Sequence, residues 1–377
     1  MIRYVLVVIL LLGFKAEAQS SALAIGDSLL VRGNYTKAIE AYLKHKNPKQ
    51  VNTKIAKAYI ALGNYDKAIE YYEQQLELVS KDELVMLDYA KLLSKVKKYE
   101  QASEVLHQLI DIDYKNPNYH YETGLVLERL KDSTAQNRFY SAYQLDNTHQ
   151  KAIFKIAKRH LIKRNYDQVD YYADKGLKSY ANNKELISIK AQNYYWQEDY
   201  KNAAKWFEKL LELNELTLFV HEKLSFCYSR LYEYEKAIEQ CKLALKIEPR
   251  SATNLYILGQ LYERNDDFIN AEKYILASIT LSDIPLDLEY MKLGYVYNLQ
   301  GKHKEAIEAY TRATKENPES EEAHFFVVLT KDRYYKDLDT KLKLYEDYKK
   351  KFPKSRLIVM VDKRISELKE EKFLKTD

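Results

Sequence analysis

Glycine, proline and cysteine are scarce in this sequence, which has only nine, six and two of them in 377 residues. The shortage of glycine and proline argues against sandwiches, barrels and other loop-rich folds, whose turns depend on these residues. Lysine, glutamate, leucine, alanine and tyrosine are abundant instead, which is typical of a helix-rich protein. Since 46% of the residues are hydrophobic, the chain can fold throughout, and its length predicts several domains or a repeat array.

Neither sign of charge dominates. The formal net charge is +5. We interpret the basic and acidic residues as alternating along the chain, without a block of one sign. Because a nucleic-acid-binding protein needs a concentrated basic stripe, we expect no nucleic-acid partner.

Motifs for catalysis are absent as well. The sequence has no glycine-rich phosphate loop and no Gly-x-Ser-x-Gly nucleophile elbow, and its eight histidines are scattered without a zinc-ligand pair. Three of them, His120, His160 and His221, fall at positions expected to pack between helices. We therefore expect no catalytic residue, no cofactor, no metal site and no enzymatic activity.

The N-terminus has the features of an export signal. Arg3 precedes an apolar stretch at residues 4–14, and Ala16 and Ala18 form a small-x-small site. The stretch is shorter than the roughly 20 apolar residues of a membrane span, so we expect cleavage between Ala18 and Gln19 and no stable membrane insertion afterwards. No cysteine is available there for a lipid anchor, and a periplasmic location is favoured over secretion. The Ala-Glu-Ala-Gln ending resembles signal peptides common in the Bacteroidetes.

An internal repeat of about 34 residues runs through the rest of the chain. Its clearest copies are residues 33–40 (Gly-Asn-Tyr-Thr-Lys-Ala-Ile-Glu) and 63–70 (Gly-Asn-Tyr-Asp-Lys-Ala-Ile-Glu). Downstream of the tyrosine, a small residue precedes an aromatic one by four positions, as at Ala306 and Tyr310, so both lie on one buried helix face. The tyrosine position itself recurs at Tyr35, Tyr65, Tyr99, Ser133 (degenerate), Tyr166, Tyr200, Tyr234, Phe268 and His303.

This pattern resembles the tetratricopeptide repeat family. One of the best-matching units carries Leu293, Gly294, Tyr297, Gly301, Ala306, Tyr310, Ala313 and Pro318. The resemblance implies an all-α fold: a right-handed α-solenoid, or superhelix, of about ten antiparallel helix-pair repeats with a C-terminal capping helix. The units at residues 118–147 and before Pro353 are the least regular. We divide the chain into a signal peptide (residues 1–18), tandem repeats (residues 19–353) and a capping helix with a tail (residues 354–377).

The repeat register places Cys227 on the first helix of a unit and Cys241 on the second. They are either buried free thiols or, in an oxidising compartment, a disulfide, and the sequence leaves both possibilities open.

The same register places a set of first-helix residues in the concave groove of the solenoid. After about residue 188 the set becomes rich in aromatic and arginine side chains, which are frequent in binding hot spots. The predicted partner-binding residues are Tyr195, Trp196, Phe219, Glu222, Phe226, Arg230, Tyr256, Gln260, Arg264, Tyr295 and Asn298.

The resemblance and the export signal together predict a non-catalytic scaffold or adaptor of the bacterial cell envelope, which binds envelope or secretion-system proteins in its groove. Two alternatives stay open: a periplasmic holdase-like chaperone for exported or outer-membrane polypeptides, and an accessory of a nutrient-uptake system. A scaffold should bind a defined partner at a fixed ratio, whereas a chaperone should bind many unfolded chains weakly. The sequence predicts neither the partner nor the oligomeric state.

Overall fold

The structure is a computed structural model that describes residues 22–282 and 286–375. The predicted signal peptide, with its cleavage point at Ala18 and Gln19, lies outside these residues. The described residues form helices and turns and contain no strand. The chain divides into two compact units, unit 1 up to Ile189 and unit 2 from Lys190 onwards.

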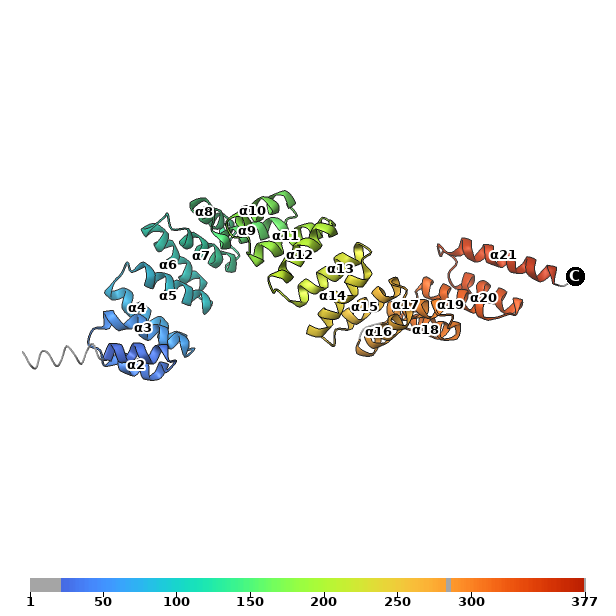
Figure 1. The fold of residues 1–377 in the computed structure, drawn as a ribbon, viewed down its shortest axis with the longest axis horizontal. Coiled ribbons are helices and arrows are strands. Elements are labelled where there is room, and N and C mark those ends of the chain that lie inside the picture. Colours follow the sequence, from blue (N-terminus) through green and yellow to red (C-terminus); the bar gives the residue numbers. More distant parts are fainter. Residues whose placement is uncertain (1–21, 283–285, 376–377) are drawn as a thin grey trace, which may run out of the picture. The chain divides into compact units, whose positions relative to one another are not determined.

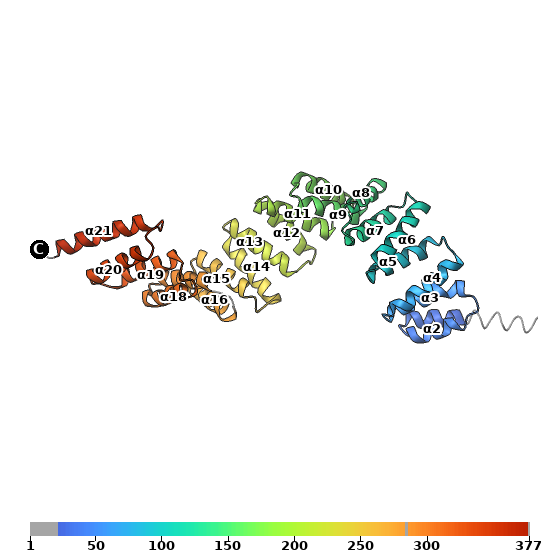
Figure 2. The same cartoon turned by 180° about the vertical axis from the view of Figure 1, so that it is seen from behind.

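Unit 1 consists of consecutive short helices. Helical residues 22–31 are followed by α2 (Tyr35–Leu43), α3 (Pro48–Ala61), α4 (Tyr65–Leu78), α5 (Glu83–Lys95), α6 (Tyr99–Ile112), α7 (Pro117–Arg129), α8 (Ala135–Leu145), α9 (Gln150–Ile162) and α10 (Tyr166–Ser179). Each helix from α2 to α10 packs against the next one along the chain (Figures 1 and 2). The division between the units falls within α11 (Lys184–Trp196).

Unit 2 continues the same arrangement. Its helices are α12 (Tyr200–Glu212), α13 (Leu218–Arg230), α14 (Tyr234–Ile247), α15 (Ala252–Arg264), α16 (Phe268–Leu281), α17 (Asp287–Leu299), α18 (His303–Glu316), α19 (Glu321–Tyr334), α20 (Leu338–Lys351) and α21 (Ile358–Leu374). From α12 to α21 each helix again packs against its successor. The described residues thus form ten helix pairs followed by one further helix, which confirms the predicted all-α array of about ten repeats with a C-terminal helix.

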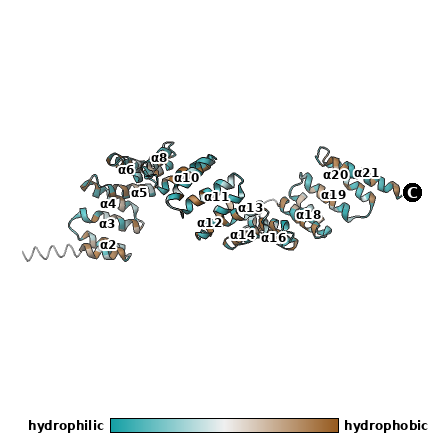
Figure 3. Ribbon diagram, turned by 45° about the horizontal axis from the view of Figure 1, so that its top comes forward, coloured by the Kyte–Doolittle hydropathy of each residue, from teal (hydrophilic) through white to brown (hydrophobic). Residues whose placement is uncertain are grey.

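In nine of the ten pairs, the second helix buries the position where the repeat pattern predicts a small residue, together with the residue four positions later. Both positions are buried because residues four apart share one helix face. The pairs are Ala38 and Tyr42, Ala68 and Tyr72, Ala102 and Leu106, Ala135 and Phe139, Val169 and Ala173, Ala203 and Phe207, Ala237 and Cys241, Ala271 and Ile275, and Ala306 and Tyr310. Hydrophobic and hydrophilic residues are accordingly mixed along the helices (Figure 3).

The small residues of the first helices allow the two helices of a pair to approach closely. A Cβ atom on Gly294 would lie 2.8 Å from Cε1 of Tyr310, and one on Gly124 would lie 2.6 Å from Cε1 of Phe139. These distances leave no room for a methyl group unless the ring moves.

In nine of the ten pairs, the turn between the two helices places one residue in the left-handed region. This residue always lies two positions before the repeat aromatic or its substitute, and its φ ranges from 57° to 77°. The nine residues are Gly33, Gly63, Lys97, Lys131, Arg164, Glu198, Tyr232, Asp266 and Gly301. Six of these turns therefore adopt a left-handed conformation without glycine, which explains how the chain builds so many turns with so few glycines.

The prolines that the structure describes lie near helix ends, where they do not interrupt the helical hydrogen bonds. Helices α14, α18 and α20 end two residues before Pro249, Pro318 and Pro353. Pro117 instead is the first residue of α7, a position where the missing backbone N–H costs no helical hydrogen bond.

Candidate protein-binding groove

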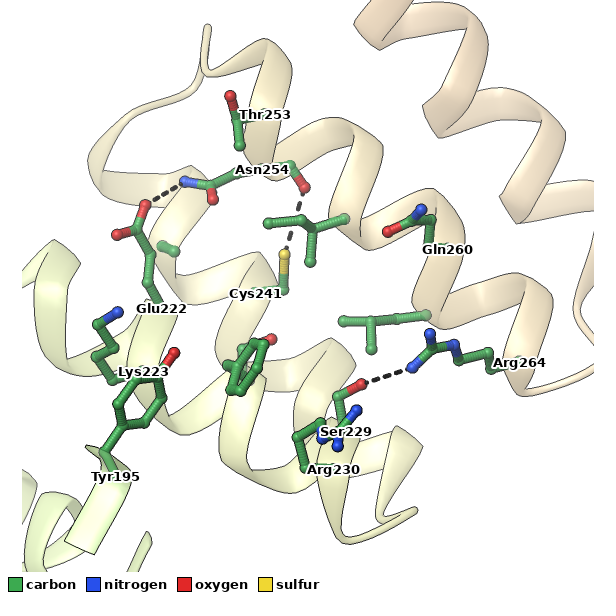
Figure 4. Close-up of a pocket in the computed structure, with 15 residues that line it drawn as sticks. Tyr195, Glu222, Lys223, Ser229, Arg230, Cys241, Thr253, Asn254, Gln260 and Arg264 are labelled. Carbon is green, nitrogen blue, oxygen red and sulfur yellow. Dashed lines mark hydrogen bonds between the residues drawn. The ribbon is translucent and has the colours of Figure 1, made fainter. Parts of the chain in front are cut away.

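The first helices of three successive repeats in unit 2 enclose a pocket of about 390 Å³. Tyr195 comes from α11, residues 222–230 come from α13, and residues 253–264 come from α15 (Figure 4). The α14 residues Cys241 and Ala244, both buried, also line it. Because residues one turn apart share a helix face, α13 and α15 each present a continuous stripe to the pocket.

Aromatic and aliphatic side chains form the apolar part of the pocket. The ring of Phe226 lies 5.4 Å from that of Tyr195 and 5.7 Å from that of Tyr200, measured between centroids. Ile257 and Leu261 contribute aliphatic surface from α15. Phe226 and Ile257 are both exposed, so their apolar surface is available to a partner.

Three cations and one carboxylate line the same pocket. Glu222 accepts a hydrogen bond from Asn254 Nδ2 at 2.9 Å, and Arg264 Nη1 donates to Ser229 Oγ at 3.2 Å (Figure 4). Lys223 Nζ lies 4.5 Å from the centre of the Tyr195 ring, and the Arg230 guanidinium lies 5.4 Å from the centre of the Tyr200 ring. Lysine and arginine over aromatic rings are partly held in place, so the pocket combines apolar surface with oriented positive charge.

The structure brings together six of the eleven predicted partner-binding residues in this pocket: Tyr195, Glu222, Phe226, Arg230, Gln260 and Arg264. The other five lie outside its lining. The Trp196 ring packs edge-on against Tyr195 with 5.6 Å between centroids, and Phe219 packs against Phe207 with 6.0 Å. Tyr256 is half-buried and Tyr295 is exposed. Asn298 is engaged by hydrogen bonds with Thr330 (2.9 Å) and His303 (2.9 Å).

Sequence reasoning missed several lining residues, chiefly Lys223, Ser229, Thr253, Asn254 and Ile257. The helix period could have found Ile257, because it lies four residues after Thr253 and seven before Arg264 on one face of α15. The predicted residue Tyr256 precedes Ile257 and points about 100° away around the helix, and it is not part of the pocket lining.

The histidines expected to pack between helices do so. His120 and His221 are buried, and His221 Nδ1 lies 2.8 Å from Gln240 Oε1. His160 is half-buried and stacks on the Tyr172 ring at 5.6 Å between centroids.

Both cysteines are buried free thiols rather than a disulfide. Burial raises the pKa of each thiol to about 12. Cys241 Sγ donates a hydrogen bond to the carbonyl oxygen of Asn254 at 3.4 Å.

Within residues 22–282 and 286–375, no group of three or more histidine, cysteine, aspartate and glutamate side chains is arranged to hold a metal ion. The helices in that part of the chain are also too short or too polar to cross a membrane.

The interpretation that basic residues form no block is wrong. Between Asp146 and Asp167 the sequence contains no acidic residue, and the intervening segment includes the whole of α9. Its cations are Lys151, Lys155, Lys158, Arg159, Lys163 and Arg164. The overall balance of charge hid this segment, which a sliding count of charge along the sequence would have found.

Comparison with known proteins agrees with the repeat register. Models of the tetratricopeptide repeat match residues 59–121, 252–284 and 288–320. The second match begins with α15 and includes α16, and the third includes nearly all of α17 and the whole of α18.

Two curated relatives share about a quarter of their aligned residues with this chain. The human "Antiviral innate immune response effector IFIT1" is 25% identical over 260 residues, which cover 65% of this chain and 48% of the relative. The "TPR repeat-containing protein MJ1428" of Methanocaldococcus jannaschii is 25% identical over 313 residues, covering 78% of this chain and 51% of the relative. The chain thus spans about half the length of these relatives.

Among solved structures, a MamA protein has a TM-score of 0.43 and 19% identity, covering 45% of this chain and 92% of that one. Yeast Tom70 has a TM-score of 0.39 and 15% identity, covering 96% and 98% of the two chains. The repeat matches, together with the helix pairs on which they lie, show that the chain contains tetratricopeptide repeats.

Proposed function

We propose that this chain is a non-catalytic scaffold or adaptor that binds a partner protein in the unit 2 pocket. Tetratricopeptide repeat proteins generally mediate protein–protein interaction. The observation that carries the proposal is the pocket itself, where an exposed aromatic and aliphatic floor adjoins oriented cations. Aromatic and arginine side chains contribute much of the binding energy at protein interfaces.

The envelope location rests on the predicted signal peptide. A basic residue, an apolar stretch and a small-x-small site at Ala16 and Ala18 are the features that support it. We infer that the mature chain acts in the periplasm, on components of the cell envelope or of a secretion system. Fractionation of cells that express the full chain with a C-terminal tag would test this, because a tag found only in the cytoplasm would contradict export.

The binding proposal is tested by a double variant, Phe226→Ala with Ile257→Ala, which removes the apolar floor of the pocket. A matched control, Phe373→Ala with Ile269→Ala, removes the same two residue types from exposed positions on α21 and α16. All four side chains are exposed, so both double variants should keep the wild-type helix content.

The partner is identified by crosslinking in intact cells, followed by purification of the tagged chain. We expect one or two proteins in a fixed ratio to the wild-type chain and to the control, and their loss from the pocket variant. Equal recovery with the pocket variant would refute binding at this pocket. A broad set of unfolded exported proteins that compete with one another would instead support the holdase-like chaperone.

A further inference from the structure

Helix α9 of unit 1 carries a strongly basic surface. The acid-free segment between Asp146 and Asp167 lies within a chain whose charges otherwise nearly balance. Along α9 and the turn that follows it, Lys155, Arg159 and Lys163 recur every four residues, and Lys158 lies three residues after Lys155, which places them along one side of the helix.

These cations line a second pocket, of about 490 Å³. Helix α7 contributes Glu128 and Arg129, α8 contributes Gln136, and α9 with its following turn contributes Lys155, Lys158, Arg159, Ile162 and Lys163. Five cations thus line the pocket with a single carboxylate. Glu128 Oε2 pairs with Lys155 Nζ at 2.5 Å, and the other four cations form no ion pair with a residue that the structure describes.

The pocket also contains a buried hydrogen-bond donor that has no partner among the described residues. Gln136 Nε2 is buried without a hydrogen-bond partner in the described part of the chain, although the Gln136 side chain lines the pocket. Burial lowers the pKa of His160, and the positive charges of Lys163 and Arg159 lower it further. The local excess of positive charge therefore reaches the neighbouring, half-buried imidazole.

From this arrangement we propose that the unit 1 pocket binds an acidic segment of a partner protein. The cations extend over about 12 Å along α9, from Lys155 to Lys163, at 1.5 Å per residue. About four residues of an extended peptide cover that length, so several carboxylates can each meet a cation. Arg129 and Arg159 present planar guanidinium groups that can pair with carboxylates through two hydrogen bonds.

A peptide fits this pocket better than an isolated phosphate or a nucleic acid does. Ile162 is 74% exposed among the cations and offers an apolar contact to an aliphatic side chain of a peptide, which a free phosphate lacks. Single-stranded nucleic acids rely on aromatic side chains for base stacking, and no aromatic residue lines the pocket.

The test measures fluorescence anisotropy of a labelled peptide of alternating glutamate and leucine with the purified chain. We expect saturable binding that weakens as salt rises from about 50 to about 300 mM, because exposed charges are screened over this range. The same peptide with glutamine for glutamate should not bind. The variant Arg129→Gln, Arg159→Gln and Lys163→Gln should bind the acidic peptide about tenfold more weakly or worse.

A matched control is Lys44→Gln, Lys81→Gln and Lys115→Gln, which removes the same charge from exposed positions of unit 1 outside the pocket. It should bind the acidic peptide as the wild type does. The variant Phe226→Ala with Ile257→Ala should also bind it normally, so this inference and the proposed function can fail separately.

Three results would overturn the inference. One is the absence of saturable binding of the acidic peptide to the wild-type chain. Another is an equal loss of affinity in the control, which would show that only net charge matters. The third is that inorganic phosphate or a single-stranded oligonucleotide displaces the labelled peptide at a lower concentration than the unlabelled peptide requires. That result would assign the pocket to the displacing ligand.

Discussion

One buried carboxylate joins α21 to the last helix pair, beside an apolar cluster that includes Val361 and Leu368. Asp332 is 7% exposed and is bonded by Arg364 Nε at 2.9 Å, Lys341 Nζ at 3.1 Å and the Tyr345 hydroxyl at 3.0 Å. Of these groups only Arg364 belongs to α21. The helix otherwise buries only Val361 and Leu368 fully, so Arg364→Ala should loosen α21 selectively.

The size of the effect follows from the geometry. Removing one partner of a buried ion pair costs roughly 3–5 kcal/mol, because the remaining charge is left buried without compensation. In the variant, Asp332 would still be bonded to Lys341 and Tyr345, and the Arg364 side chain is 27% exposed. We therefore expect a smaller loss of stability than this range. A loss of about 2 kcal/mol corresponds to an increase of about 30-fold in the population of undocked α21.

Hydrogen exchange measured by mass spectrometry resolves this change by segment. Peptides from α21 should lose about 30-fold in protection in the Arg364→Ala variant, whereas peptides from α13 should not change, because each repeat contacts only its neighbours. The control is Arg356→Ala, whose ion pair with Glu322 is exposed. Exposed pairs contribute little, so α21 should stay protected. Equal exchange in the two variants would refute the role given to Arg364.

The same cluster predicts an effect of pH. Burial alone would raise the pKa of Asp332, but hydrogen bonds from Arg364, Lys341 and Tyr345 outweigh it, and the pKa falls below the usual 3.8. The stabilisation is therefore fully present above pH 3.8 and is lost as the pH falls through the lower pKa of the folded chain. In Arg364→Ala, protection of α21 should depend less on pH in this acid range.

Two further predictions concern the turns and the thiols. Lys97→Gly should raise the free energy of unfolding by about 1 kcal/mol, because Lys97 has a φ of 66° and glycine relieves that strain. Urea unfolding measures this change in the free energy of unfolding. The control Glu104→Gly, at an exposed position within α6, should instead lower the free energy of unfolding by about 1 kcal/mol. Cys227 and Cys241 should not react with a thiol reagent at about pH 8 until the chain is unfolded, since buried thiols remain protonated. After unfolding without a reducing agent, two thiols per chain should react with the reagent. Fewer than two reactive thiols per chain would contradict the free-thiol state.

The repeat architecture could be predicted from the sequence because close packing imposes strict residue types. Gly294 faces the Tyr310 ring at a distance that excludes a methyl group, and Ala306 lies one turn before that tyrosine. Such positions tolerate few residues, so they recur along the sequence with a visible period. The turn position carries no such signature, because Lys97 or Tyr232 can adopt the left-handed conformation that glycine favours at Gly63.

The candidate sites were harder to predict because surface positions are not restricted by packing. In unit 2 the repeat register selected Phe226 and Arg264, which line the pocket, and Tyr256 rather than its neighbour Ile257, which lines it. Residues next to each other on a helix differ in direction by about 100°, and exposed positions carry no packing constraint that separates them. In unit 1 the basic pocket joins α7 and α9, so Arg129 and Arg159 meet only after folding. Charge totals over the whole chain could not reveal it.

The two pockets differ in chemistry, and this difference argues that they serve different partners. The unit 2 pocket has an aromatic floor at Tyr195 and Phe226, where a partner would gain mainly from buried apolar area, which salt weakens little. The unit 1 pocket offers Arg129, Arg159 and Lys163 with less apolar surface and no aromatic side chain, where a partner would gain mainly from charge, which salt screens. In an array where each repeat contacts only its neighbours, changes at one pocket leave the packing of the other intact. Loss of binding at either pocket can therefore be assigned to that pocket alone.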